Sequence, residues 1–226
     1  MKATHFSKYT EIPINIEMPK NSMFGDYSSV VAMHIAQEVG VPADRIAKEI
    51  IAQIDLSQSY IEKVELKNGF INFSLKKECL AKFLHQIELI DFQGRKTEFS
   101  DTEDFFDLEY AYAVICRILT VNSGSYKHEP DMSMKEEEEI FAKIIINYPN
   151  SQEEKFVLAY LKNVMAGFLN YSSKCKINTT VNLLWKEPSE IRYFLLNKAA
   201  LSMKNMVLLL GREFEDSGVL RKNFSN

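Results

Sequence analysis

The sequence predicts an α+β N-terminal domain, a small sheet with helices, followed by an all-α helical bundle. Two observations lead to this fold class. Within residues 1–90, apolar and polar residues alternate on both sides of an Asn-Gly pair, which is typical of a β-hairpin. From residue 108, apolar residues recur at helical spacing almost to the end of the chain. We therefore divide the 226 residues into a domain over 1–90, an acidic linker over 91–107 and a helical bundle over 108–226.

The hairpin is the most strongly patterned part of the first domain. Asn68 and Gly69 suit the two central positions of a type I′ turn, which both need positive φ. With that turn, Lys67 faces Phe70, Leu66 faces Ile71, Glu65 faces Asn72, and Val64 faces Phe73. Since alternate residues of a strand point to opposite sides, one side is apolar, with Val64, Leu66, Ile71, Phe73 and Leu75. The other side, called the polar face below, carries Lys63, Lys67, Phe70, Asn72 and Ser74.

The polar face combines an aromatic ring, a carboxamide and two ammonium groups. Such a set can stack on a base and hold a phosphate. In this interpretation Phe70 stacks, Asn72 contacts a base edge, and Lys63 or Lys67 lies near phosphate. The alternative is an ordinary solvated strand face with one exposed Phe, because single exposed apolar residues are common.

Helices surround this hairpin in the sequence. Asp26, Ser28 and Ser29 supply N-cap chemistry for a helix over 29–39, which Gly40 ends. Pro42 suits the first turn of a second helix, whose apolar stripe is Ile46, Ile50, Ile51 and Ile54. A third helix is predicted over 77–88.

The second domain is helical in its pattern. The first helix begins at Leu108 and is apolar nearly all round, so we expect it to be buried on most sides. Further helices are predicted over 136–146, 154–171 and 188–210. The segment before them, 91–107, contains six acidic and two basic side chains, and we interpret it as an extended, solvated linker.

The composition predicts an ordinary soluble protein of the cytoplasm. Hydrophobic residues make up 46% and charged residues 26% of the chain, and the net charge is −4. No secretory signal and no membrane-spanning stretch is visible. Cys79, Cys116 and Cys175 lie far apart inside apolar patterns, which favours reduced, buried thiols. The four His residues have no metal-ligand spacing, so we expect no metal site and no cofactor.

Two groups of motifs resemble a known family. The stretch Ile16-Glu-Met-Pro-Lys-Asn-Ser-Met-Phe-Gly-Asp-Tyr-Ser-Ser, followed by an amphipathic helix and then Gly69-Phe-Ile-Asn-Phe, resembles the N-terminal additional domain of arginyl-tRNA synthetases. In that family the domain contacts the D-loop at the outer corner of the tRNA. The resemblance implies that Phe70 and Asn72, together with Asn68, contact the tRNA. The hairpin register independently places Phe70 and Asn72 on the polar face.

The helix after Leu108 resembles the opening of the family's DALR-type anticodon-binding bundle. Tyr110, Ala111, Ala113, Ile115 and Cys116 match its motif, while Tyr112 stands where His is usual and Val114 where Arg is usual. The resemblance and the basic loop farther on suggest the anticodon-binding candidates Tyr110, Tyr112, Arg117, Lys174, Lys176 and Trp185. Packing of Trp185 against the bundle is the alternative to RNA stacking.

The gap between the two regions predicts a protein without catalysis. Only about twenty residues separate the predicted third helix from Leu108, and no His-Ile-Gly-His-like motif or P-loop occurs. We therefore expect a non-catalytic tRNA-binding protein that contacts the D-loop and the anticodon stem-loop of a tRNA, the arginine tRNA by resemblance. The alternatives are a protein-interaction or regulatory module that has lost RNA binding, and a subunit that supplies tRNA contacts to a separate synthetase chain.

Overall fold

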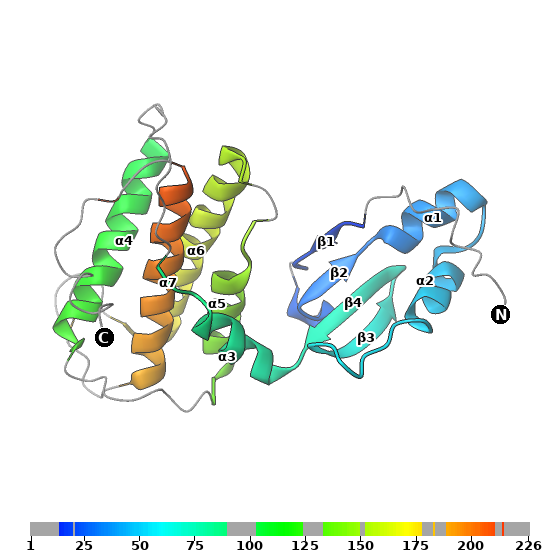
Figure 1. Cartoon of the computed structure of the whole chain (residues 1–226), viewed down its shortest axis with the longest axis horizontal. Helices are drawn as coiled ribbons and strands as arrows, with labels where there is room; N and C mark the ends of the chain where they lie inside the picture. The colour runs from blue at the N-terminus through cyan, green and yellow to red at the C-terminus, as the bar shows by residue number, and fades with distance from the viewer. Residues whose placement is uncertain are drawn as a thin grey trace. The chain divides into compact units, whose positions relative to one another are not determined.

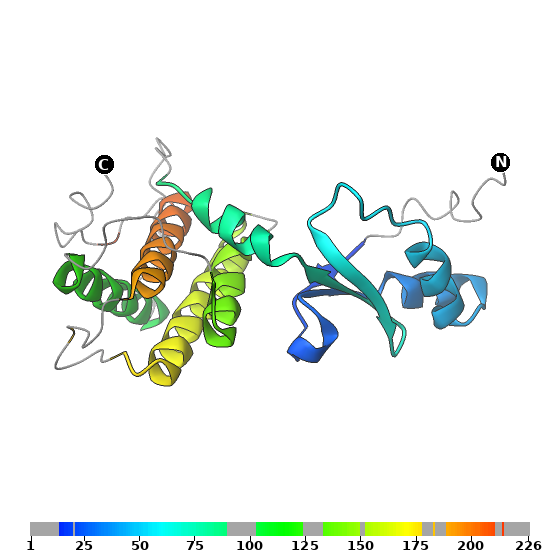
Figure 2. The same ribbon diagram turned by 90° about the horizontal axis from the view of Figure 1, so that it is seen from below.

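The computed structural model describes residues 14–19, 21–89, 103–123, 133–149, 152–177, 183, 189–210 and 214. The chain forms two compact units that divide between Cys79 and Leu80. The N-terminal unit contains an antiparallel sheet with helices, and the second unit is helical (Figures 1 and 2). The predicted fold class is confirmed.

The sheet of the N-terminal unit has four strands in the order β1-β2-β4-β3. The strands are β1 (Ile16–Glu17), β2 (Tyr27–Ser29), β3 (Ile61–Lys67) and β4 (Phe70–Leu75), and the short 3-10 helix η2 (Ser22–Phe24) precedes β2. Two helices, α1 (Val31–Val39) and α2 (Ala43–Ile51), pack on one face of the sheet. Their core contains Val31, Ala32, Ile35, Ile46 and Ala47 with Ile71 of β4, and Val64, Leu66 and Phe73 pack against it.

Hydrogen bonds explain where α1 begins and ends. The Ser29 hydroxyl accepts a bond from the Val31 amide at 3.3 Å, and Gly40 ends the helix in the left-handed region at φ 68°. Gly40 was predicted in this role. The predicted cap by Ser28 or Ser29 is wrong, because both residues belong to β2 and the N-cap position is Val30, which makes no side-chain cap bond. Asp26 differs from the prediction, because its carboxylate accepts the amide of Leu75 at 2.6 Å. Asp26 therefore ties β2 to the end of β4 instead of capping α1.

The second unit packs four long helices around one core. They are α4 (Glu103–Val121), α5 (Glu136–Ile146), α6 (Glu154–Lys174) and α7 (Glu190–Leu209). Helix α7 contacts each of the other three, which explains why it is apolar nearly all round. The largest fully buried side chains here include Phe141, Leu161, Phe168, Tyr171 and Leu195.

The boundary between the units differs from the sequence interpretation. Helix α3 (Lys77–His85) begins in the N-terminal unit, but Leu84 and Ile87 lie in the core of the helical unit. The chain therefore enters the second unit before the predicted linker over 91–107, not after it. Moreover, α4 begins at Glu103, so the acidic residues 103, 104 and 107 belong to the start of a helix. Residues 91–102 lie outside the described residues.

The described residues contain neither a membrane-spanning helix nor a metal-binding cluster. Each of their helices is too short or too polar to span a bilayer. No three of their His, Cys, Asp or Glu side chains are close enough together to bind one metal ion. Cys79 and Cys116 are buried free thiols, and Cys175 is partly exposed.

Candidate nucleic-acid interface

The hairpin has the predicted turn and the predicted register. Asn68 and Gly69 both have positive φ, 53° and 78°. Lys67 pairs with Phe70, Leu66 with Ile71, Glu65 with Asn72, and Val64 with Phe73. A Cβ atom at Gly69 would lie 2.7 Å from the Met33 Cε atom of α1, but that atom is the end of a flexible side chain and can move aside. Glycine is therefore favoured here by the positive φ of the turn.

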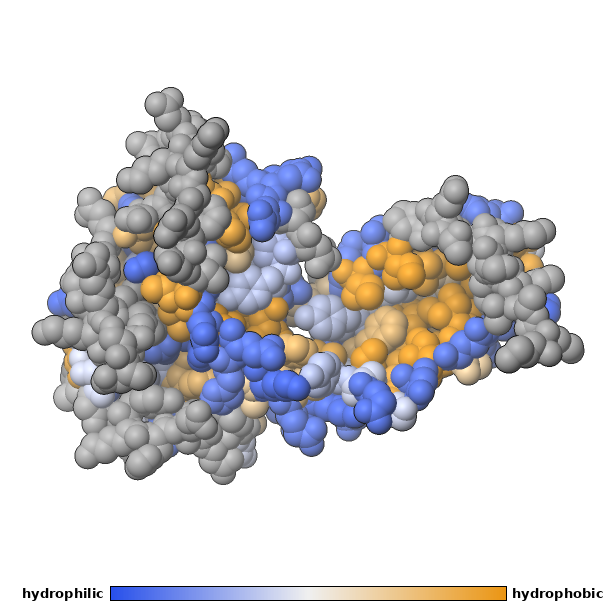
Figure 3. All heavy atoms as spheres, in the orientation of Figure 1, coloured by the Kyte–Doolittle hydropathy of each residue, from blue (hydrophilic) through white to orange (hydrophobic). Residues whose placement is uncertain are grey.

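Strand pairing also shows what surrounds the polar face. Asn72 pairs with Glu65 on one side and with Ser28 on the other, and Ser28 pairs in turn with Glu17. Because directly paired residues point to the same side, these four side chains form one row across the sheet. Asn72 thus lies between two carboxylates, one on each outer strand. Figure 3 shows hydrophilic residues along the margin of this unit where β3 and the loop before it lie.

Asn72 lies on the predicted side of the hairpin, but it is covered. Its side chain is only 4% exposed. The amide nitrogen donates to the Phe70 carbonyl at 3.3 Å, and the amide oxygen is buried without a hydrogen-bond partner. A buried acceptor without a partner costs about 1–3 kcal/mol. Phe70 is half-buried and Asn68 is exposed, so these two side chains are the accessible ones among the three that the family motif singles out.

The two lysines of the polar face both have partners in the protein. The Lys63 ammonium lies 2.8 Å from the Glu65 carboxylate. That hydrogen bond, together with the positive charges of Lys63 and Lys67, lowers the pKa of the Glu65 carboxyl. The Lys67 ammonium donates to the Met23 carbonyl at 2.9 Å and lies 5.9 Å from the centre of the Phe24 ring. A phosphate would therefore have to replace or join these contacts.

In the helical unit, two predicted residues share an exposed face of α4. Tyr110 is 62% exposed, and Arg117 is exposed two helical turns farther on. Residues seven apart lie on the same side of a helix. Phe106, four residues before Tyr110, is 70% exposed and extends this stripe. The sequence interpretation missed Phe106, although its spacing from Tyr110 could have revealed it. Phe106, Tyr110 and Arg117 are called the α4 stripe below.

Tyr112 does not belong to this stripe. Its side chain is 3% exposed, and its ring stacks on Phe214 with the centroids 4.3 Å apart. Two residues along a helix rotate the side chain by about 200°, so a residue next but one to Tyr110 points to the opposite side. Tyr112 is therefore a core residue here and presents no surface to a ligand.

The remaining candidates come from another part of the fold. Lys174 and Lys176 are both exposed at the C-terminal end of α6, a different helix from that of the α4 stripe. Lys176 has a positive φ of 53°. The Ile177 amide bonds to the Ser172 carbonyl at 2.8 Å and the Lys176 amide to that of Ser173 at 3.3 Å, which is the Schellman pattern. Trp185 lies outside the described residues.

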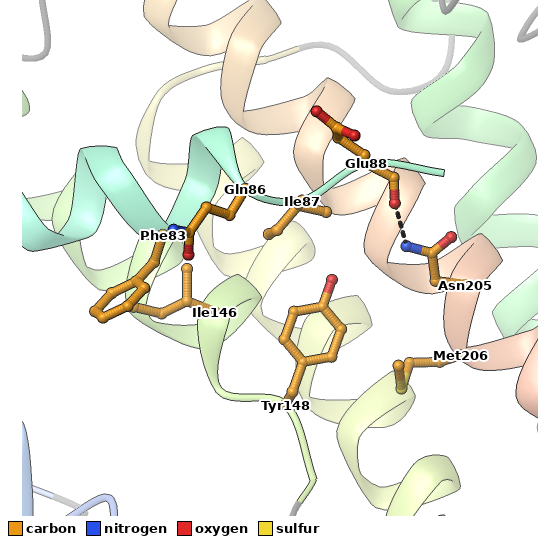
Figure 4. A pocket seen from close by; sticks show the side chains of 8 residues that line it. All are labelled: Phe83, Gln86, Ile87, Glu88, Ile146, Tyr148, Asn205 and Met206. Atoms are coloured by element: carbon orange, nitrogen blue, oxygen red, sulfur yellow. Dashed lines mark hydrogen bonds between the residues drawn. The ribbon is translucent and has the colours of Figure 1, made fainter. Parts of the chain in front are cut away.

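The helical unit also contains a cavity of about 320 Å³. Its walls are mainly apolar and come from the end of α3, the end of α5 and helix α7: Phe83, Gln86, Ile87, Glu88, Ile146, Tyr148, Asn205 and Met206 (Figure 4). None of these described lining residues is basic, which does not favour phosphate binding. The Asn205 amide donates to the Glu88 carbonyl at 2.7 Å, and the Lys198 ammonium to that of Ile87 at 2.8 Å. These bonds fasten the chain after α3 to α7.

Comparison with known proteins finds a family model that is similar to the region containing the hairpin. Residues 2–75 match the family described as "Arginyl tRNA synthetase N terminal domain". The match ends at the last residue of β4 and so includes the whole hairpin. No solved structure matches the chain.

Curated relatives agree with this family. The arginine–tRNA ligase of Metamycoplasma arthritidis is 41% identical over 81 residues, 35% of this chain and 15% of the ligase. That of Bacillus subtilis is 35% identical over 80 residues, 34% of this chain and 14% of the ligase. That of Listeria monocytogenes is 33% identical over 98 residues, 42% of this chain and 18% of the ligase. The matching part of the chain thus spans less than a fifth of the length of these relatives.

Proposed function

We propose that this chain is a non-catalytic tRNA-binding protein of the cytoplasm that contacts the D-loop, at the elbow of a tRNA, through its hairpin. The observation that carries the proposal is the position of Phe70. It lies on the polar face in the register that the turn predicts, within a region similar to the N-terminal domain of arginyl-tRNA synthetases. Because the relatives are named arginine–tRNA ligases, we propose arginine tRNA as the ligand.

The contacts at the hairpin follow from the accessible groups. The partly exposed Phe70 ring stacks on an unpaired base of the D-loop, as aromatic side chains do with splayed RNA bases. Asn68 lies beside it on the turn. Lys63 and Lys67 exchange their present partners, a carboxylate and a carbonyl, for phosphate oxygens. The Asn72 amide nitrogen continues to donate to the Phe70 carbonyl. The Asn72 amide oxygen, which has no hydrogen-bond partner in the free protein, accepts a hydrogen bond from a base once the RNA has displaced the atoms that cover it.

The helical unit contributes a second contact in this proposal. We assign it to the DALR-type anticodon-binding bundles and assign the anticodon stem-loop to the α4 stripe. Two exposed rings and a guanidinium on one helix face suit unpaired bases and backbone phosphate. Lys174 and Lys176 add positive charge at the end of α6. Tyr112 has no part in this contact, because it lies in the core.

The proposal includes no catalytic activity, because the sequence shows no motif for binding a nucleotide. The chain passes from Glu88 to the start of α4 at Glu103 with no nucleotide-binding motif between them. Arginine-dependent exchange of pyrophosphate into ATP should therefore not exceed that of a protein-free blank. Exchange above the blank would contradict the non-catalytic role.

Direct titration tests the binding itself. We expect the purified chain to bind arginine tRNA more tightly than an unrelated tRNA. Binding should weaken between about 50 mM and about 200 mM salt, since phosphate contacts release counterions. Equal affinity for both tRNAs would contradict the proposal that arginine tRNA is the ligand. If no tRNA binds at the lower salt concentration, the proposed tRNA-binding function is wrong.

A protein-interaction or regulatory module is the second candidate. It is favoured by the engaged lysines of the polar face and by the exposed apolar residues of the α4 stripe. A chain of this kind would co-purify with a protein partner and bind no tRNA. Co-purification with a synthetase chain, with tRNA binding retained, would instead identify a subunit that supplies tRNA contacts in trans.

A further inference from the structure

Glu65 adds a negative charge to the side of the sheet that carries the polar face. It lies on the same side of the sheet as Lys63 and Lys67 and directly opposite Asn72. Its carboxylate forms an ion pair with the Lys63 ammonium at 2.8 Å. The positive charge of Lys67 also stabilises the ionised carboxylate and so helps to lower its pKa. A surface that binds RNA through phosphate gains from free cations. Here a carboxylate neutralises one of the two cations at the point where a phosphate would lie.

Stability does not account for this ion pair. The side chains are 60% exposed for Lys63 and 37% exposed for Glu65. An ion pair exposed to this degree is screened by water and salt and adds little to folding. The Lys67 ammonium, in contrast, is held by a neutral carbonyl, so its charge is not compensated by that contact.

We propose that Glu65 is a specificity-determining residue that suppresses sequence-independent RNA binding at the polar face. This inference rests on the proposed function. Contacts to phosphate carry no sequence information, whereas stacking and base-edge contacts depend on which bases are unpaired. A carboxylate beside Lys63 weakens the first kind of contact and leaves the Phe70 ring free for the second. An RNA with an unpaired base in reach of Phe70 therefore retains an advantage over any other RNA.

The test compares Glu65→Gln with Glu62→Gln. Both variants remove one negative charge from β3 and keep the size of the side chain. Glu62 is exposed on the same strand, so it controls for the change in net charge. The Kd is measured for arginine tRNA and for a blunt-ended RNA duplex with the same number of nucleotides, which offers phosphates but no unpaired base, each over a series of salt concentrations. Melting temperatures of both variants should equal that of the wild-type protein.

We expect Glu65→Gln to tighten binding of the RNA duplex about three- to tenfold and tRNA binding by a smaller factor. The slope of log K against log salt should steepen by about one phosphate contact, because Lys63 becomes free to release a counterion. Glu62→Gln should change both affinities less and leave the slope unchanged. Equal effects of the two variants, no effect of Glu65→Gln, or tighter binding of tRNA alone would overturn the inference.

A failure of the proposed function gives a different result. If the wild-type chain binds neither RNA, the tRNA-binding role is lost. Binding of the RNA duplex gained by Glu65→Gln would then still support the suppressing role of the carboxylate. If that variant also binds no RNA, both the proposed function and this inference are wrong.

Discussion

The hairpin and helix α4 carry the same kind of motif residues, yet the fold uses the two sets differently. In the hairpin, Phe70 and Asn72 lie on the same side, where the sequence pattern placed them. In α4, Tyr110 reaches the surface while Tyr112 lies in the core. A strand returns to the same side every second residue, but a helix has rotated by about 200° over that distance. Motif residues two positions apart thus lie on the same side of a strand and on opposite sides of a helix.

The largest expected effect separates the two tyrosines of α4. Tyr112→Ala removes a buried ring that stacks on Phe214, and loss of a buried aromatic ring costs about 3–5 kcal/mol. Tyr110→Ala, on the exposed side, should change the free energy of unfolding by less than about 0.5 kcal/mol. Urea unfolding followed by the helical circular-dichroism signal measures both. Similar losses from the two variants would contradict the placement of these rings.

High pH should affect the helical unit through its buried phenols. Burial raises the pKa of Tyr148 to about 12, whereas the phenol of an unfolded chain titrates near 10. The unfolded state therefore loses this proton first, and the stabilisation present below about pH 10 is lost as the pH rises towards 12. The expected loss at about pH 11.5 is about 2 kcal/mol from this group. Burial also raises the pKa of Tyr160 and Tyr171, and that of Tyr27 in the N-terminal unit.

Tyr148→Phe isolates this contribution. We expect the variant to lose less stability than the wild-type protein between about pH 9 and pH 11.5, measured by urea unfolding at each pH. Identical pH profiles would show that the phenol is not shielded from water in the folded chain.

At the hairpin, Phe70→Ala should weaken tRNA binding about tenfold or slightly more. Stacking of one base on an aromatic side chain is worth about 1–3 kcal/mol. The matched control is Phe156→Ala, which removes a partly exposed ring from α6. Fluorescence titration with arginine tRNA gives the two affinities, and thermal melting checks the fold. A large drop in melting temperature for Phe70→Ala would mark its ring as core and not as a binding surface.

The smallest effect concerns the lysines at the end of α6. Lys176 has a positive φ, which costs free energy for any residue with a Cβ atom. Lys176→Gly removes this cost and should stabilise the helical unit by about 1 kcal/mol. Lys174→Gly places glycine in the last helical turn and should destabilise it by up to about 1 kcal/mol. Both variants lose one ammonium group, so their opposite shifts in unfolding free energy report the backbone alone. Shifts of the same sign would argue against the Schellman end of this helix.

Local chemistry in the sequence determined the elements of the fold. Asn68-Gly69 and the period-two pattern were sufficient for the hairpin register, because turn type and strand alternation are properties of neighbouring residues. The predicted helix over 136–146 agrees with α5 at both ends. Gly40 ends α1 as its own backbone freedom predicts.

Only the tertiary structure decided how the candidate residues are presented. Asn72 is covered, Lys63 is paired with Glu65, and Lys67 reaches a carbonyl 44 residues away. The burial of Tyr112 depends on Phe214, about a hundred residues farther along the chain, and the boundary inside α3 depends on the core that receives Leu84. The partners of Lys67 and Tyr112 are distant in sequence, so no local spacing reveals these contacts. The Lys63–Glu65 pair joins residues two apart on one strand, so strand alternation by itself could have indicated it. A turn and a strand period are set within a few residues, whereas the exposure of a side chain and its long-range contacts depend on which distant residues the fold places next to it.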